Sequence, residues 1–261
     1  MTDGGMAAAL RARRDAGAKL LVPYLVAGMT EDWVEVLQAV AAAGADAVEV
    51  GIPFSDPMMD GPVIQEASLL ALQRGTTPAA VVDAVAEAGV EVPIAVMTYY
   101  NLVFRTGHRR MARSLAEAGI GGAIVPDLPL EELGPWAVEA DEAGVATILL
   151  VAPSSPAERV RRICERSRGF VYAVARMGVT GERVSLGSST TDVVLRVQAA
   201  TDIPVCAGVG ISTPAQAVEA CRTADGVIVG SAIVRRLLEH GGPDAAAALV
   251  VDLRDALDDL A

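Results

Sequence analysis

Three carboxylates lie close together in the segment from residue 48 to residue 62, which reads V-E-V-G-I-P-F-S-D-P-M-M-D-G-P. Glu49 lies within an apolar run, whereas Asp56 and Asp60 follow in a stretch that contains three prolines. Such a run is typical of a parallel strand that is buried beneath helices. Burial of an unpaired carboxylate is unfavourable and raises its pKa. We therefore predict that Glu49 serves as a general acid or base.

The remaining sequence predicts the strands that would position Glu49. Apolar runs alternate with helix-like segments, and we expect strands at Leu20 to Val26, Ala45 to Val50, Pro93 to Met97, Gly122 to Val125, Ala146 to Val151, Phe170 to Val174, Ile203 to Cys206 and Gly226 to Val229. This alternation indicates βα units and a parallel sheet. Eight units in 261 residues favour the α/β class and a (β/α)8 TIM barrel, as one domain over residues 1–261 with a short extra N-terminal helix. A doubly wound sheet is the alternative, but no G-x-G-x-x-G follows the first run.

The expected helix ends carry residues with known positional preferences. Left-handed glycines should end helices at Gly44, Gly89, Gly119 and Gly144. Helix caps are expected at Thr30, Thr77 and Ser155, with Pro78 and Pro156 at the first helical position.

Glycine pairs follow the last three predicted strands: Gly178 and Gly181, then Gly208 and Gly210, then Gly230 with Ser231. Glycines let a backbone approach an anion closely, and a helix N-terminus offers free N–H groups. Each pair alone is equally typical of a tight turn between a strand and a helix. Three pairs at consecutive strand ends favour a phosphorylated ligand, because barrels often bind phosphate there.

Composition narrows the classes of function. A net charge of −12 argues against a protein that binds nucleic acid or anionic membranes. The N-terminal segment is too charged for a signal peptide, and no apolar run reaches the ~18 residues of a membrane span, so we expect a cytoplasmic protein. Lys19, the only lysine, precedes the first strand, which disfavours imine catalysis.

Metal and thiol chemistry are also disfavoured. The three cysteines show no metal-binding spacing, and we interpret them as apolar core or incidental thiols. His108 and His240 lie far apart without an evident partner. The remaining interpretation is proton transfer on a phosphorylated substrate, with the carboxylates opposite the phosphate. At this level an isomerase, an aldolase and a lyase all stay open.

Six blocks make the sequence similar to the tryptophan synthase α chain family. They are V-E-V-G-I-P-F-S-D-P-M-M-D-G-P-V-I-Q from residue 48, T-Y-Y-N-L-V-F from 98, P-D-L-P-L-E-E from 126, G-V-T-G from 178, G-V-G-I-S from 208 and G-S-A-I-V from 230. The resemblance implies a TIM barrel that splits indole-3-glycerol phosphate into indole and glyceraldehyde 3-phosphate. It also implies a partner, the pyridoxal-phosphate-dependent β chain, in an α2β2 assembly. The pyridoxal phosphate would belong to that partner, and no cofactor is expected in this chain.

The same resemblance implies roles for individual residues. Glu49 matches the proton shuttle, Asp60 the carboxylate that binds the indole N–H, and Tyr172 the active-site tyrosine. The remaining matches are Tyr24, Met97 and Ile124 for the indole pocket, Gly181, Gly210, Gly230 and Ser231 for phosphate, Thr180 for loop closure, and Pro53, Asp56 and Asn101 for the partner interface.

The sequence departs from the family's usual pattern near the first loop, at Gly28-Met29-Thr30, and before Asp60, at Met58-Met59. Neither departure removes a catalytic group. They lend weight to one alternative, a stand-alone lyase that releases free indole. A second alternative is a catalytically silent activator of a β chain, but the presence of both Glu49 and Asp60 argues against it.

Overall fold

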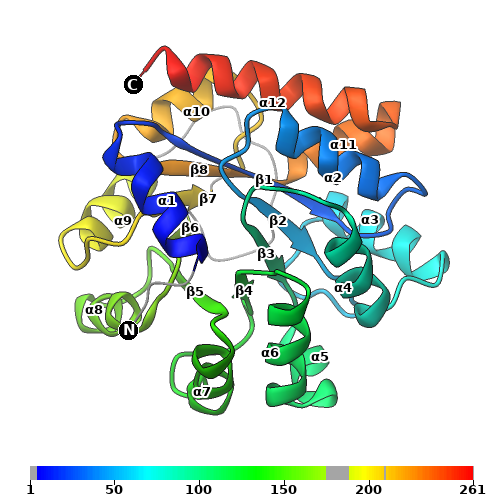
Figure 1. Ribbon diagram of the computed structural model, residues 1–261. Coiled ribbons are helices and arrows are strands. Elements are labelled where there is room, and N and C mark those ends of the chain that lie inside the picture. Colours follow the sequence, from blue (N-terminus) through cyan, green and yellow to red (C-terminus); the bar gives the residue numbers. More distant parts are fainter. Residues whose placement is uncertain (1–4, 175–187, 209, 261) are drawn as a thin grey trace.

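Eight parallel strands close into a barrel in the computed structural model, which describes residues 5–174, 188–208 and 210–260 (Figure 1). Each strand pairs with its neighbours in sequence order, and β1 pairs with β8. The strands are β1 (Leu20–Val26), β2 (Val48–Gly51), β3 (Ile94–Met97), β4 (Gly122–Ile124), β5 (Ala146–Val151), β6 (Val171–Val174), β7 (Val205–Gly208) and β8 (Gly226–Val229). The predicted TIM barrel is therefore confirmed, and all eight predicted apolar runs contain or overlap a strand.

Helices surround the barrel, and in the described part of the chain two helices rather than one follow each of β2, β3 and β8. The helices between and after the strands are α2 (Trp33–Ala42), α3 (Pro62–Gln73), α4 (Pro78–Glu87), α5 (Tyr100–Thr106), α6 (His108–Glu117), α7 (Gly134–Ala143), α8 (Ala157–Arg166), α9 (Ser188–Gln198), α10 (Pro214–Cys221), α11 (Ser231–His240) and α12 (Pro243–Asp258). In the part of the chain that is described, no helix is both long and apolar enough to cross a membrane.

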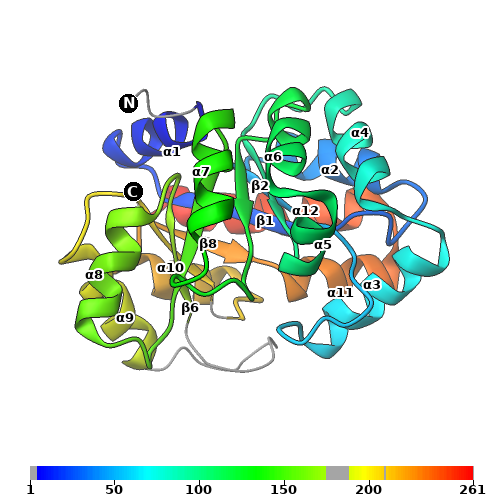
Figure 2. The ribbon, with the colours of Figure 1, turned by 90° about the horizontal axis from the view of Figure 1, so that it is seen from below.

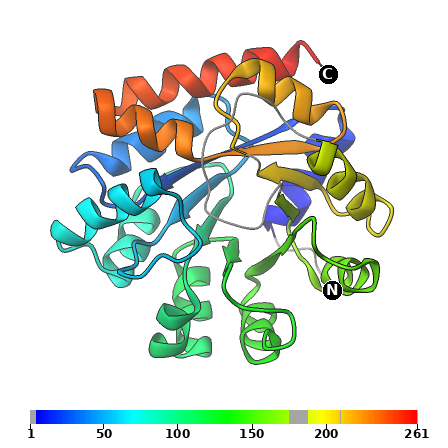
Figure 3. The same cartoon turned by 180° about the vertical axis from the view of Figure 1, so that it is seen from behind.

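The predicted N-terminal helix, α1 (Gly5–Asp15), covers the end of the barrel where the strands begin. Met6 and Leu10 are buried against Leu20 and Phe170 inside the barrel. Close packing at Gly122, the first residue of β4, leaves no room for a Cβ, which would lie 2.8 Å from the Met6 sulfur. Accordingly α1 lies in front of the barrel in Figure 1 and behind it in Figure 3. The opposite end of the barrel, where the strands finish, is not covered by α1.

A buried ion pair holds α12 and the start of β1 to the end of the barrel where the strands begin. Arg254 of α12 donates to Asp46, just before β2, over 3.0 Å, and also to the Lys19 carbonyl over 2.9 Å. Asp46 accepts a further hydrogen bond from the Leu21 backbone over 2.8 Å. Because these buried charges are paired and hydrogen-bonded, α12 and β1 are fixed relative to the strand that bears Glu49.

Helix ends follow the expected chemistry in most places. The four predicted glycines all have positive φ, between 63° and 106°, and Thr77 caps α4 by accepting from the Ala80 backbone N–H. Two predicted caps are wrong. Asp32 rather than Thr30 precedes α2, and Pro156 is itself the cap of α8. Ser155 instead accepts a hydrogen bond from the Ala152 N–H over 3.2 Å, which closes the preceding turn.

Candidate active site

Glu49 lies on β2 and points into the barrel, between Tyr24 of β1 and Ala95 of β3 in the strand register. Its side chain is fully buried, and neither carboxylate oxygen has a hydrogen-bond partner among the described residues. Burial, together with the negative charge of Asp60, raises the pKa of Glu49 to about 8. A carboxylic acid with that pKa is about 90% protonated at pH 7, so it is ready to donate a proton.

Asp60 lies on the loop between β2 and α3 and has a different environment. Burial raises its pKa to about 6, but a hydrogen bond from the Tyr99 hydroxyl, 3.1 Å from Oδ2, acts in the opposite direction. Tyr99 also accepts from the Met59 N–H over 3.0 Å and stacks on Phe54 with ring centroids 4.9 Å apart. Asp60 is therefore mostly ionised at pH 7, whereas Glu49 is mostly protonated.

Tyr99 is a site residue that the sequence reasoning missed. It lies within the T-Y-Y-N block and directly follows β3, two residues beyond Met97. The ends of neighbouring parallel strands meet at one edge, so its position after β3 was the available signal.

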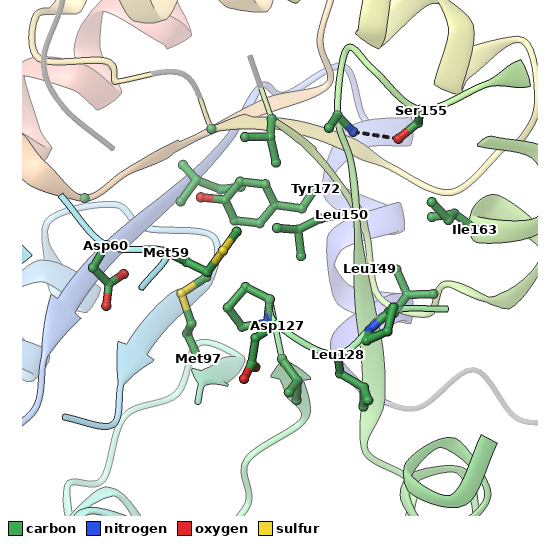
Figure 4. Close-up of a pocket in the computed structure, with 18 of the residues that line it drawn as sticks. Met59, Asp60, Met97, Asp127, Leu128, Leu149, Leu150, Ser155, Ile163 and Tyr172 are labelled. Carbon is green, nitrogen blue, oxygen red and sulfur yellow. Dashed lines mark hydrogen bonds between the residues drawn. The ribbon is translucent and has the colours of Figure 1, made fainter. Parts of the chain in front are cut away.

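A cavity of about 790 Å³ opens at the carboxyl ends of the strands (Figure 4). Both carboxylates line it, together with most of the predicted pocket and phosphate residues: Tyr24, Met97, Tyr172, Gly210, Gly230 and Ser231. Figure 2 shows the barrel from the side, with α3 and α11 near the same end. The structure thus brings predicted residues from six separate segments to one cavity.

The side of the cavity that is predicted to bind phosphate is formed by the ends of β7 and β8. Gly210 has a φ of 73°, which favours glycine. Ser231 is the first residue of α11, and Gly230 precedes it as the cap residue. The free N–H groups of this helix N-terminus and its dipole are suited to an anion.

Not every predicted residue reaches the cavity. Ile124 is fully buried within the barrel, beside Ile148 and Phe170, and does not line the cavity wall. In the strand register Ile124 pairs with Met97 of β3 and Ile148 of β5, and its side chain is part of the apolar core inside the barrel. Gly181 and Thr180 lie outside the described residues.

The residues predicted to face a partner also differ in exposure. Asp56 and Asn101 are exposed, whereas Pro53 is buried at the start of the loop after β2. Ser55 donates to Asp56 over 2.6 Å, which orders the exposed part of the loop. Met58, on the same loop as Asp56, is 80% exposed, and Phe104, on the same helix as Asn101 (α5), is 64% exposed, so both add apolar surface there.

The cavity also extends beyond the predicted pocket, along the outer side of β5. Leu149 faces the helices there, and Leu128, Leu130 and Ile163 complete an apolar lobe (Figure 4). This lobe could not be predicted from the sequence, because its residues have the ordinary pattern of packing between a strand and its helix.

His108 and the three cysteines do not line this cavity. His108 does have a partner, contrary to expectation: its Nε2 lies 3.0 Å from the Tyr100 hydroxyl, and the two rings stack. All three cysteines are free and buried. Within the described ranges, no cluster of three or more potential ligands could hold a metal ion.

One protonated and one ionised carboxyl group at the mouth of a TIM barrel define an enzyme that moves protons on a small ligand. Comparison with known proteins identifies the family within this class of enzyme. The family model of the tryptophan synthase alpha chain matches residues 10–255. The curated alpha chain of Streptomyces coelicolor is 48% identical over 244 residues, covering 92% of this chain and 89% of the relative.

Other relatives agree over similar lengths. The tryptophan synthase alpha chain of Halorhodospira halophila is 46% identical over 252 residues, covering 95% of this chain and 91% of that one. A solved structure of Mycobacterium tuberculosis tryptophan synthase superposes with a TM-score of 0.90 and 40% identity, over 97% of this chain and 98% of the other. The chain belongs to the tryptophan synthase alpha chain family, lyases of tryptophan biosynthesis that cleave indole-3-glycerol phosphate.

Proposed function

We propose that Glu49 and Asp60 are the catalytic pair for cleavage of indole-3-glycerol phosphate in this chain. The observation that supports this is their opposite protonation at neutral pH, with pKa values of about 8 and about 6. The reaction needs one acid that can give up a proton and one anion that stabilises positive charge.

Glu49 carries the proton in both directions. Its acid form protonates indole C3, which makes the ring a cation. The bond between C3 and the first chain carbon then breaks, and its electron pair restores the neutral ring as indole. The hydroxyl on that chain carbon becomes the aldehyde of glyceraldehyde 3-phosphate and returns its proton to Glu49, so no net proton is consumed.

Asp60 stabilises the cationic ring. As C3 gains a proton, the ring N–H becomes more positive, and an ionised carboxylate that accepts from it lowers the barrier. Tyr99 holds this carboxylate by its 3.1 Å hydrogen bond. The tyrosine is a positioning residue in this scheme.

The rest of the cavity orients the substrate. Tyr24, Met97 and Tyr172 form the wall for the ring, with Tyr172 as the tyrosine beside Glu49. Gly210, Gly230 and Ser231 receive the phosphate at the start of α11. From the resemblance we assign Gly181 to the same phosphate site and Thr180 to closure over it.

We further propose that the chain works in the cytoplasm with a tryptophan synthase β chain, as α2β2, and holds no cofactor of its own. The pyridoxal phosphate would belong to the β chain. Asp56 and Asn101 are the exposed contacts in this proposal, with apolar surface from Met58 and Phe104 around them. From the resemblance we assign Pro53, which is buried at the start of the same loop, to this interface as well.

The test is indole release from indole-3-glycerol phosphate, measured with and without a β chain. A subunit is nearly idle alone and accelerates steeply with its partner, whereas a stand-alone lyase is equally active in both. Glu49→Gln should lower the rate by about 10²-fold or more in the complex. The matched control is Glu35→Gln, an exposed change on α2 that should have no effect. Full activity of Glu49→Gln would refute the mechanism.

A further inference from the structure

The position of the Tyr24 side chain points to a second role for this residue, in addition to forming the pocket wall. Its ring lies across the mouth of the barrel between the ends of β8 and β2. A Cβ added to Gly230 would lie 3.3 Å from the Tyr24 ring carbon Cδ1. A Cβ added to Gly51 would overlap the Tyr24 hydroxyl and approach the ring carbon Cζ within 2.7 Å.

These contacts explain why Gly51 ends β2 and why Gly230 directly follows β8. Gly51 lies two residues beyond Glu49 on β2, so both positions face the barrel interior. Tyr24 occupies the space that a side chain at position 51 would fill. Its hydroxyl is thereby placed one layer above Glu49, toward the open end of the cavity.

The Tyr24 hydroxyl has no hydrogen-bond partner among the described residues. It differs in this from Tyr99, which is bonded to Asp60, and from Tyr100, which is bonded to His108. Tyr24 is 8% exposed and lines the cavity. Burial and the charges of Asp60 and Glu49 raise its pKa well above the usual value, so the phenol keeps its proton and can only donate or accept a hydrogen bond.

The substrate must cross this same region. Its phosphate is assigned to Gly230 and Ser231 and its ring to Asp60, so the three-carbon chain runs from the end of β8 toward β2. The Tyr24 ring follows that path, with one edge at Gly230 and its hydroxyl at Gly51. The substrate hydroxyl nearest Glu49 is the one on the carbon whose bond breaks.

We propose that the Tyr24 hydroxyl donates a hydrogen bond to this substrate oxygen as it becomes the aldehyde oxygen. No proton is transferred from Tyr24: the substrate hydroxyl gives its proton to Glu49, and the phenol stabilises the negative charge that develops on the oxygen. The proposal rests on the proposed function and names a third group that acts at the bond being broken.

The test variant is Tyr24→Phe, which removes only the hydroxyl. Because that hydroxyl has no hydrogen-bond partner among the residues that the structure describes, the variant should fold with an unchanged thermal midpoint. With a β chain present, kcat for indole-3-glycerol phosphate cleavage should fall about 10-fold or more, as expected for a lost hydrogen bond to a developing charge. Tyr100→Phe is the matched control, and it should leave kcat of the chain unchanged.

Indole-3-propanol phosphate separates hydrogen bonding from packing, because it has the ring and the phosphate but no chain hydroxyls. Its dissociation constant should be equal for the wild-type chain and for Tyr24→Phe. An unchanged kcat in Tyr24→Phe would overturn the proposal, as would a loss of analogue affinity as large as the loss of kcat. If instead the wild-type chain fails to cleave the substrate with or without a β chain, the proposed function itself is wrong.

Discussion

The burial of Glu49, the proposed catalytic acid, predicts that this residue destabilises the fold at alkaline pH. Its pKa is about 8 in the folded chain and 4.5 in the unfolded reference. Because the folded-state pKa is raised, the folded chain keeps a proton that the unfolded chain loses above pH 4.5. The free energy of unfolding therefore falls as pH rises from about 4.5, and the loss is complete just above pH 8.

The size of this effect follows from the two pKa values. Each unit of difference corresponds to about 1.4 kcal/mol, so the full destabilisation is on the order of 5 kcal/mol. About 4 kcal/mol of it falls between pH 5 and pH 9. That is a large part of the roughly 5–15 kcal/mol that stabilises a typical protein.

Glu49→Gln keeps the shape of the side chain and removes its titration. Urea unfolding of the wild-type chain and the variant, at each pH unit from 5 to 9, gives the difference directly. The variant should gain stability relative to the wild type by about 4 kcal/mol over this range, with Glu35→Gln parallel to the wild type. If the free energy of unfolding depended on pH in the same way for the wild type and Glu49→Gln, Glu49 would ionise in the folded chain without a free-energy cost. Its proposed role as an acid at pH 7 would then be refuted.

Three further outcomes are expected. The pH profile of kcat/KM should rise near pH 6 as Asp60 ionises and fall near pH 8 as Glu49 loses its proton; a flat profile from pH 5 to 9 would contradict the paired roles. Tyr99→Phe removes the hydrogen bond that lowers the pKa of Asp60, so the acidic limb should move to higher pH, and an unmoved limb would show that Tyr99 does not support Asp60. Thr77→Ala should lower the free energy of unfolding by about 1 kcal/mol in urea without changing kcat, because it removes only the cap of α4; a change in kcat would link α4 to the site.

The sequence predicts the barrel well because the features that build it are local. The run from Leu20 to Val26 is a strand over its whole predicted length, and Gly144 ends α7 with a φ of 76° as expected. Glu49 was recognisable because a carboxylate inside an apolar strand conflicts with its neighbours. Such conflicts can be seen without coordinates.

Features that depend on distant segments could not be predicted. The placement of Ile124 depends on which face of a three-residue strand meets Phe170, and no periodicity resolves that in so short a strand. Ser155 does not cap α8, because its hydroxyl accepts a hydrogen bond from the Ala152 N–H in the tight turn that precedes the helix. The hydrogen bond from Tyr99 to Asp60 links residues that are 39 positions apart in the sequence. The residues around each of them do not indicate that the two side chains meet.

The two carboxyl groups differ in pKa because of one difference in their surroundings. Burial raises the pKa of both, but only Asp60 has a hydroxyl that stabilises its anion. The Asp60 charge in turn raises the pKa of Glu49, so support given to one carboxylate keeps the other protonated. A hydrogen bond to Glu49 would satisfy its buried oxygens and stabilise the fold, yet it would also lower the pKa that makes Glu49 an acid at pH 7. In the proposed mechanism Glu49 needs this lack of a hydrogen-bond partner, which holds among the described residues, and the stability lost at alkaline pH is its physical consequence.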